Sequence, residues 1–154
     1  MQNRELIQPV ENSSRQYTSL LENVHEIEGT IVHRLTRFLQ TLTEIQDEVV
    51  DLRLKKILKE EHPYLPMIHV DRIQENTPYR KYSLYEISRT FINQRRELSK
   101  FLYNVPEELW KRTGVHENEG HVTFQEFVRR LTEKDHTTIL RLQRTVETKE
   151  NQIA

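Results

Sequence analysis

The sequence has no cysteine, few glycines and prolines, and no long apolar run, and each shortage removes a class of protein. Without cysteine the chain can form no disulfide, thiolate nucleophile or cysteine-ligated zinc site. Its 3 glycines and 5 prolines in 154 residues are too few for a turn-rich β-sandwich or barrel, so we expect a mainly helical chain. No apolar stretch reaches the roughly 18 residues that a membrane-spanning helix needs.

Neither sign of charge is in excess. The 23 basic and 24 acidic side chains leave a formal net charge of −1, which gives no general attraction to nucleic acid or to anionic membranes. The N-terminal sequence has no basic segment followed by an apolar run, the pattern of a secretory signal. We therefore expect a cytoplasmic protein whose partners include neither nucleic acid nor membrane.

The sequence is rich in charge and in helical periodicity. Charged residues make up 31% and apolar residues 35% of the chain, a balance typical of amphipathic helices around a narrow core. The length fits one domain. Residues 1–12 contain Pro9 and few apolar side chains, so they are expected to be a flexible N-terminus, with residues 13–150 forming a single helical-bundle domain.

Apolar residues recur at helical spacing through the first third of the chain. They are Tyr17, Leu20, Leu21, Val24, Ile27, Ile31, Leu35, Phe38, Leu42, Ile45, Val49 and Leu52. Taken alone, this stripe fits one very long helix, and Gly29-Thr30 is its only internal break signal. Glycine costs about 1 kcal/mol inside a helix, and threonine favours a helix start. Because a four-helix bundle needs a reversal near this point, we expect helices at about 13–28 and 31–61.

Prolines and capping residues mark the rest of the chain. His62-Pro63-Tyr64-Leu65-Pro66 ends the second helix, because a residue that precedes proline disfavours the helical conformation. Residues 62–82 then form a long connection, as in a bundle with one crossover. Ser83-Leu-Tyr-Glu86 and Thr123-Phe-Gln-Glu126 fit capping boxes that begin the third and fourth helices, and Pro106 fits the first position of a short helical turn. The expected fold is all-α: a four-helix bundle with a long crossover between helices 2 and 3.

Three short motifs lie close together before the last helix. They are Pro106-Glu-Glu-Leu-Trp110, Thr113-Gly-Val-His116 and the helix start Thr123-Phe-Gln-Glu126. In this order they resemble the DinB/YfiT-like superfamily, a group of bacterial four-helix bundles with a three-histidine metal site. The resemblance covers roughly residues 33–145 and is most specific in this segment. It implies a DinB/YfiT-like bundle, and, since such proteins are often homodimers, a homodimer.

The resemblance also implies that the metal site has been lost. In the family the last helix carries a His-Asp-x-x-His motif, whose histidines lie one turn apart so that both can bind one metal. The matching stretch here is Lys134-Asp-His-Thr-Thr138. The closest match to the segment with the third histidine is Thr41-Leu-Thr-Glu-Ile-Gln46, or Leu42 if the register slips by one residue. The family metal positions thus hold Thr41, Lys134 and Thr138, and we expect no metal cofactor.

Lys134 lies on or beside the apolar stripe of the last helix. An unpaired ammonium is costly to bury, so this lysine must pair, reach water or line a wet cleft. One hypothesis is that it replaces the charge of the metal and pairs with Glu44, Asp47 or Asp135. In that case Lys134→Ala would cost about 3 kcal/mol or more. The alternative is that Lys134 extends to solvent from a slightly rotated helix.

His136 is the remaining histidine within the altered motif. Its neighbours one turn away are Thr132 and Leu140, so it has no second ligand on its own helix. The possible cleft residues are Glu44, Asp47, Asp135 and His136. A substitute metal site formed by His136 with Glu44 or Asp47 is an alternative to complete loss of the metal.

Two functions are compatible with these observations. The first is a non-catalytic bundle that binds a small ligand or a protein. The second is a metal-dependent enzyme of the same superfamily, of the thiol transferase or hydrolase type, that holds zinc or nickel through substituted ligands. The missing histidines favour the first. No catalytic residue can be assigned, because the sequence has no nucleophile elbow, glycine-rich phosphate loop or spacing that pairs a nucleophile with a base.

Overall fold

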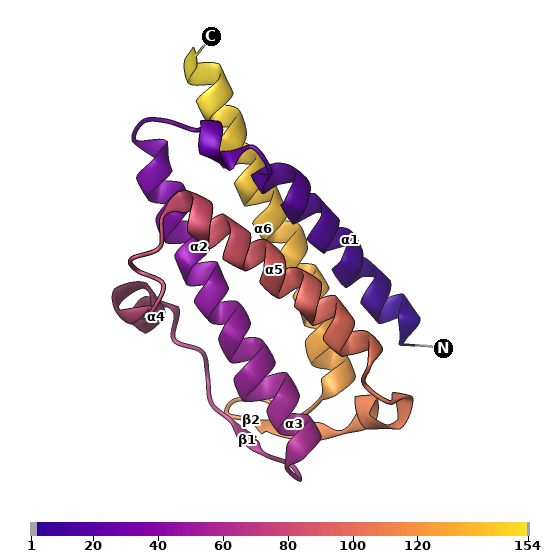
Figure 1. Cartoon of the computed structure of the whole chain (residues 1–154). Coiled ribbons are helices and arrows are strands. Elements are labelled where there is room, and N and C mark those ends of the chain that lie inside the picture. The colour runs from indigo at the N-terminus through magenta and orange to yellow at the C-terminus, as the bar shows by residue number, and fades with distance from the viewer. Residues whose placement is uncertain (1–2, 154) are drawn as a thin grey trace.

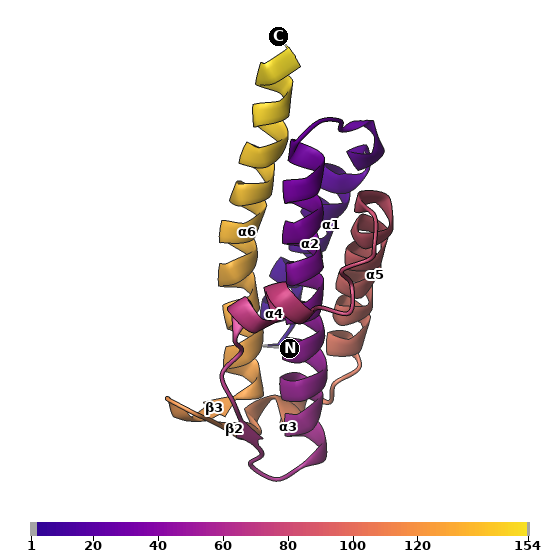
Figure 2. The same ribbon diagram turned by 90° about the vertical axis from the view of Figure 1, so that its left-hand side faces the viewer.

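Four long helices form a bundle in the computed structural model, which describes residues 3–153 (Figure 1). They are α1 (Arg4–Leu21), α2 (Ile31–Asp47), α5 (Leu84–Tyr103) and α6 (Phe124–Ile153). α1 and α6 run in one direction and α2 and α5 in the other (Figures 1 and 2). Because α2 and α5 are parallel neighbours, the chain must return along the bundle between them. The predicted four-helix bundle with a crossover between its second and third helices is confirmed.

The first helix begins earlier than the sequence predicts. Residues 4–12 are helical, and Ile7 and Val10 are buried against the core, so a flexible N-terminus is wrong for this part of residues 1–12; residues 1–2 lie outside the described residues. Proline inside a helix removes a hydrogen bond, and burial of two apolar side chains offsets that cost at Pro9. α1 ends at Leu21 rather than near residue 28, and the 3₁₀ turn Val24–Glu26 follows it.

The reversal between the first two helices lies where the sequence places it. Gly29 has a φ of +90°, a left-handed conformation that glycine adopts without the strain a side chain would cause. α2 begins two residues later at Ile31, although Thr30 makes no side-chain capping hydrogen bond. The glycine is therefore the feature that breaks the long apolar stripe.

The second long helix of the bundle changes its helical geometry after residue 47. α2 continues into a π-helical segment, Glu48–Leu54, and then into α3 (Lys55–Lys59). A π-helix has more residues per turn than an α-helix, so the inward face shifts along the sequence. Leu54 is fully buried, whereas Leu52, which the 3.6-residue period places inward, is 58% exposed. The expected helix 31–61 thus exists as one continuous helical segment that ends at Lys59. The prediction that Leu52 faces the core is wrong.

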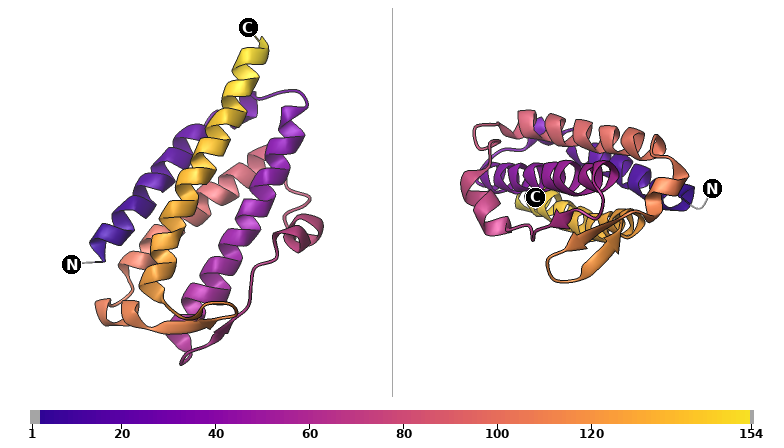
Figure 3. Two further views of the ribbon diagram at one scale, coloured as in Figure 1. Left: turned by 180° about the vertical axis from the view of Figure 1, so that it is seen from behind. Right: turned by 90° about the horizontal axis from the view of Figure 1, so that it is seen from below.

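The connections carry a small sheet that the sequence analysis does not predict. β1 (Tyr64–Leu65) pairs in parallel with β2 (Thr113–His116), which pairs antiparallel with β3 (Gly120–Thr123). The crossover also holds a short helix, α4 (Val70–Asn76), and the 3₁₀ turn Glu107–Lys111 follows Pro106. The hairpin of β2 and β3 lies across one end of the bundle (Figure 3).

Of the two predicted capping boxes, one is complete. The Ser83 hydroxyl accepts a hydrogen bond from the backbone N–H of Glu86, whose carboxylate accepts one from the backbone N–H of Ser83. At the start of α6 the Thr123 hydroxyl accepts from the backbone N–H of Glu126 at 3.0 Å. The Glu126 carboxylate, however, binds arginines on α6 instead of returning to Thr123. The second box is therefore half formed.

Two apolar clusters fill the bundle. The hairpin-side core contains Ile7, Val10, Leu54, Ile57, Leu65, Leu98, Leu102, Val105, Trp110, Val122, Phe124, Phe127, Val128 and Leu131. The turn-side core contains Tyr17, Leu21, Val24, Leu35, Leu39, Leu84, Ile87, Phe91, Ile92, Ile139 and Leu142. Buried polar residues lie between these sets along the helices, Arg95 on α5 and Asp135 on α6. Within the part of the chain that the structure describes, no helix is long and apolar enough to cross a membrane.

Candidate functional site

The candidate site is a pocket of about 920 Å³ that α2, α4 and α6 enclose. α1 packs on α5 and α6, and α2 packs on α5, but α2 and α6 meet directly over only a short stretch. Figure 2 shows α4 crossing α2 beside α6. Val70 and Gln74 of α4 form part of the pocket wall. The pocket thus lies where the fourth side of the bundle is open.

All three positions that the sequence resemblance assigns to metal ligands line this pocket. Thr41 faces it from α2, and Lys134 and Thr138 face it from α6; Leu42, the alternative to Thr41, lines it as well. Residues almost a hundred positions apart in the sequence are therefore brought to one site.

The residues at these positions do not fit a bound divalent metal. Structural and catalytic zinc sites use imidazole, thiolate or carboxylate ligands, whereas this set has two neutral hydroxyls and an ammonium, which repels a cation. Among the described residues there is no group of three or more His, Cys, Asp or Glu side chains placed to hold a metal. No chemical step through a metal can be derived for this pocket.

Lys134 is exposed at the pocket wall instead of buried in the core. Within residues 3–147, whose side chains are placed, it forms no ion pair, so the hypothesis of pairing with Glu44, Asp47 or Asp135 is wrong. The inward position on this turn of α6 is Asp135, which turns Lys134 toward water. The structure agrees with the alternative, in which the Lys134 ammonium extends to solvent from a slightly rotated helix.

The two acidic residues expected on α2 serve other contacts. Asp47 accepts hydrogen bonds from the Tyr79 hydroxyl and, at 2.6 Å, from the Gln94 amide. Glu44 lines a separate groove of about 290 Å³ beside α4, and partial burial, followed by the charges of Asp47 and Glu48, raises its pKa. Neither carboxylate lines the pocket.

His136 is exposed on α6 and also lies outside the lining of both cavities. The structure thus does not bring it together with Glu44 or Asp47 around the pocket, as the substitute metal site requires.

Asp135 belongs to a buried polar cluster at the centre of the bundle. Its carboxylate accepts a hydrogen bond from the Tyr17 hydroxyl at 2.9 Å and forms an ion pair with Arg95. Arg95 also donates to the Gln46 side-chain oxygen at 2.9 Å. Burial raises the pKa of Asp135, and the positive charge of the neighbouring Arg95 opposes that rise.

Asp135 is thus a core residue and not the cleft residue expected from the sequence, and its partners are not evident from the spacing within α6. The signal for Arg95 is its spacing, because it falls between Phe91 and Leu98 on the inward face of α5. A cation in the middle of a buried stripe requires a buried partner.

The pocket has an apolar floor and a cationic rim. The apolar lining residues are Leu35, Phe38, Leu42, Ile45 and Val70. The charged lining residues are Arg34, Arg37, Arg130, Glu133, Lys134 and Arg141. Five of these six charges are positive, in a chain whose net charge is −1, so the cations are concentrated here.

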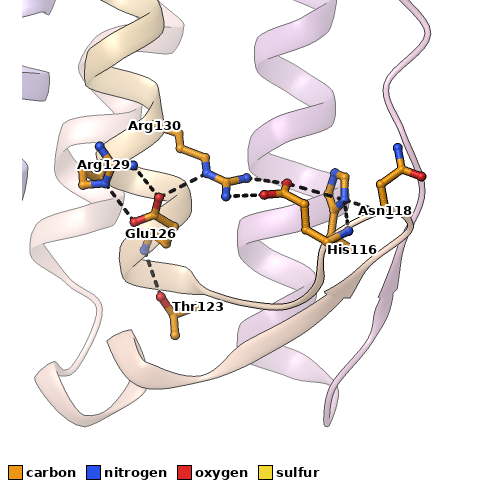
Figure 4. Close-up of polar contacts among 7 residues, drawn as sticks. His116, Asn118, Thr123, Glu126, Arg129 and Arg130 are labelled. Carbon is orange, nitrogen blue, oxygen red and sulfur yellow. Dashed lines mark hydrogen bonds and ion pairs between the residues drawn. The ribbon is translucent and has the colours of Figure 1, made fainter.

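The charge of Arg130 is compensated by carboxylates at the hairpin end of the pocket (Figure 4). Its guanidinium binds both oxygens of Glu119 at 2.7 and 2.8 Å and also contacts Glu126. The turn that carries Glu119 is held by His116, whose Nδ1 accepts from the backbone N–H groups of Asn118 and Glu119. This network ties the hairpin to α6.

The four other cations of the rim have no carboxylate partner among residues 3–147, whose side chains the structure places. Arg37 donates to the backbone carbonyl of Gln74 at 3.3 Å, which ties α2 to α4. The Arg141 guanidinium lies 4.6 Å from the centre of the Phe38 ring, and Arg34 and Lys134 form no side-chain hydrogen bond or ion pair among residues 3–147. The single lining carboxylate, Glu133, accepts from Arg129 outside the pocket.

Comparison with known proteins identifies the fold. No protein-family model and no curated protein sequence matches the chain. Among solved structures the chain is similar to YfiT from Bacillus subtilis, described as a probable metal-dependent hydrolase with an unusual four-helix bundle topology. The TM-score is 0.74 over 96% of this chain and 87% of that one, with 13% sequence identity. The fold is that of YfiT. At this identity the likeness shows the fold alone, and it confirms the YfiT-like bundle that the sequence resemblance predicts.

Proposed function

We propose that this YfiT-like bundle has lost the three-histidine metal site and binds a small ligand, without catalysis, in the pocket between α2 and α6. The observation that carries the proposal is the convergence of Thr41, Lys134 and Thr138 on one pocket. The pocket volume of about 920 Å³ lies within the range of about 300–1,000 Å³ that is usual for small-molecule sites. A pocket of this size whose lining offers hydroxyls and a cation at these positions is suited to binding rather than to metal chemistry.

The test is metal content of untagged protein, measured by plasma mass spectrometry, followed by thermal unfolding with and without zinc or nickel. The expected result is metal-free protein whose melting temperature does not rise, because a ligand stabilises a protein only when it binds the folded state. The positive control is the triple variant Thr41→His/Lys134→His/Thr138→His, which is expected to take up metal and to melt at a higher temperature when metal is added.

Near-stoichiometric metal in the unaltered protein would overturn the proposal and favour a metal-dependent enzyme with substituted ligands. His136, Glu44 and Asp47 would then be the first residues to substitute. Homodimer formation and a cytoplasmic location stay predictions; light scattering coupled to gel filtration measures the first.

A further inference from the structure

We propose that the ligand of the α2–α6 pocket is a soluble anionic amphiphile, a molecule with one negatively charged head group and an apolar chain. This inference rests on the proposed function, since it names the class of ligand that the same pocket takes. Three features of the pocket support it: an apolar floor, a cationic rim, and positive charges contributed by both helices.

The floor provides a row of apolar side chains that a hydrocarbon chain can contact. Leu35, Phe38, Leu42 and Ile45 follow one another along α2 at helical spacing, and Val70 of α4 lies at the edge. Apolar surface left in contact with water is unfavourable by about 25 cal/mol per Å², and exposed apolar patches with a polar rim often mark ligand sites. An apolar chain is the part of a ligand that this floor would bind.

The rim provides unneutralised positive charge on both walls. Arg34 and Arg37 come from α2 and Lys134 and Arg141 from α6. None of the four has a carboxylate partner among residues 3–147. Like charges that face one another across a pocket repel, and an anion between them removes that repulsion.

The chemistry of these cations favours an oxyanion head group. Guanidinium groups bind carboxylate, sulfate or phosphate through paired hydrogen bonds, and an ammonium adds a point charge. Thr137 lines the same wall of α6, and its hydroxyl can donate a further hydrogen bond. The head group would therefore lie between the two helices, with the chain along the floor.

Two other occupants fit the pocket less well. In a two-fold symmetric dimer the same patch meets itself, so four unpaired cations would oppose four others, and charged residues are depleted from the centres of interfaces. Single-stranded nucleic acid is bound by aromatic side chains that stack with the bases, and Phe38, the one aromatic residue of the lining, is covered by Arg141.

The experiment measures binding of decanoate, below its micelle concentration, by titration calorimetry at low and high salt. The unaltered protein is expected to bind decanoate, and to bind decanol and decyltrimethylammonium at least tenfold more weakly. Raising the salt concentration should weaken decanoate binding, since exposed charges are screened over about 10 Å at 0.1 M. Octanoate should bind more weakly than decanoate, by up to about fourfold for each buried methylene that is lost.

Charge-removal variants test whether the pocket is the site. Arg34→Gln/Lys134→Gln is expected to weaken decanoate binding about tenfold or more, because hydrogen bonds to charged groups are lost. The matched control is Arg89→Gln/Lys59→Gln, which removes the same two residue types from exposed positions outside the pocket and should bind as the unaltered protein does. Backbone amide shifts in NMR spectra should change most at Thr41 and Thr138.

The outcomes separate this inference from the proposed function. Equal binding of decanoate and decanol, or equal weakening by the two double variants, would overturn the anionic class while leaving a ligand pocket. Absence of decanoate binding in metal-free protein would also overturn it. Stoichiometric metal in the unaltered protein would overturn the proposed function instead. Binding to vesicles that contain anionic lipid, without uptake of monomeric decanoate, would replace the soluble amphiphile with a membrane surface.

Discussion

Arg95 of α5 and Asp135 of α6 form an ion pair at the centre of the bundle, with only 1% and 5% of their surfaces exposed. The Tyr17 hydroxyl donates to the Asp135 carboxylate from α1, and the Arg95 guanidinium lies 5.3 Å from the centre of the Tyr17 ring. The pair separates the hairpin-side core from the turn-side core. Because Arg95 also donates to Gln46 on α2, this polar cluster joins all four long helices.

Removal of one partner should be far more harmful than removal of both. Asp135→Leu leaves the Arg95 charge buried and uncompensated, so it is expected to lower the free energy of unfolding by about 3–5 kcal/mol. The double variant Arg95→Met/Asp135→Leu replaces the pair with apolar side chains and should recover most of that loss. Urea denaturation of the two single variants and the double variant gives the coupling energy. Additive losses in the double variant would contradict a direct interaction.

Tyr17 should make the protein sensitive to alkali. Burial, followed by the charge of Asp135, raises the pKa of Tyr17 well above its ordinary value of 10.0. The unfolded chain therefore loses this proton above pH 10 while the folded chain keeps it, so the free energy of unfolding falls as pH rises, by up to about 1.4 kcal/mol per pH unit. Below pH 10 this contribution is fully present.

The measurement compares Tyr17→Phe with the unaltered protein by urea denaturation at pH 8 and pH 11. The variant should be less stable at pH 8, because it lacks the hydrogen bond to Asp135, and the difference should narrow at pH 11. Tyr85→Phe is the control, since the Tyr85 side chain is 57% exposed. A difference that does not change with pH would count against a retained Tyr17 proton.

Gly114 should not tolerate a larger residue. A Cβ atom at this position would lie 2.4 Å from Leu65 Cδ1 and 3.2 Å from Ile57 Cγ1, where β2 packs on β1 and α3. Because Leu65 and Ile57 are fully buried and cannot move to solvent, Gly114→Ala is expected to cost about 1–3 kcal/mol. Leu65→Ala opens space at the same point, so the double variant should lose less than the two single variants together. Strictly additive losses would argue against this close packing.

The sequence predicts the bundle well because its signals are local. Ser83 and Gly29 act through their own backbone neighbours, and the apolar stripes follow the helical period. The features that the sequence analysis misses depend on contacts between distant segments. The hairpin around Gly114 is stabilised by packing on Leu65 and by pairing with β1, about fifty residues earlier in the chain.

The candidate site likewise combines features that the sequence predicts with features that depend on contacts between distant segments. The resemblance identifies which positions should converge, and Thr41, Lys134 and Thr138 do line one pocket. Periodicity alone leaves 134, 135 and 138 equally placed on the inward face of α6. Arg95 determines which of these positions faces the core, because its buried guanidinium binds Asp135. Lys134 is thereby turned toward solvent. That choice depends on a residue forty positions away, which no spacing rule within α6 includes.

Lys134 should therefore contribute little to stability. It is exposed and forms no ion pair within residues 3–147, so Lys134→Ala is expected to change the free energy of unfolding by less than about 0.5 kcal/mol. Urea denaturation checks this, with Lys59→Ala as the control for loss of an exposed lysine. A cost near 3 kcal/mol would mean that Lys134 is buried and paired in solution.

Release of Arg130 should strengthen the binding of anions. Glu119 binds the Arg130 guanidinium through both oxygens, and this contact lowers the pKa of Glu119. Glu119→Gln removes a negative charge beside the pocket and leaves Arg130 less compensated, so decanoate should bind about twofold more tightly at low salt, and the gain should disappear at high salt. The control is Glu97→Gln, which breaks an exposed ion pair with Lys100 outside the pocket. Weaker binding in Glu119→Gln would mean that Glu119 acts by holding the hairpin against α6, so that loss of its contact with Arg130 distorts the pocket.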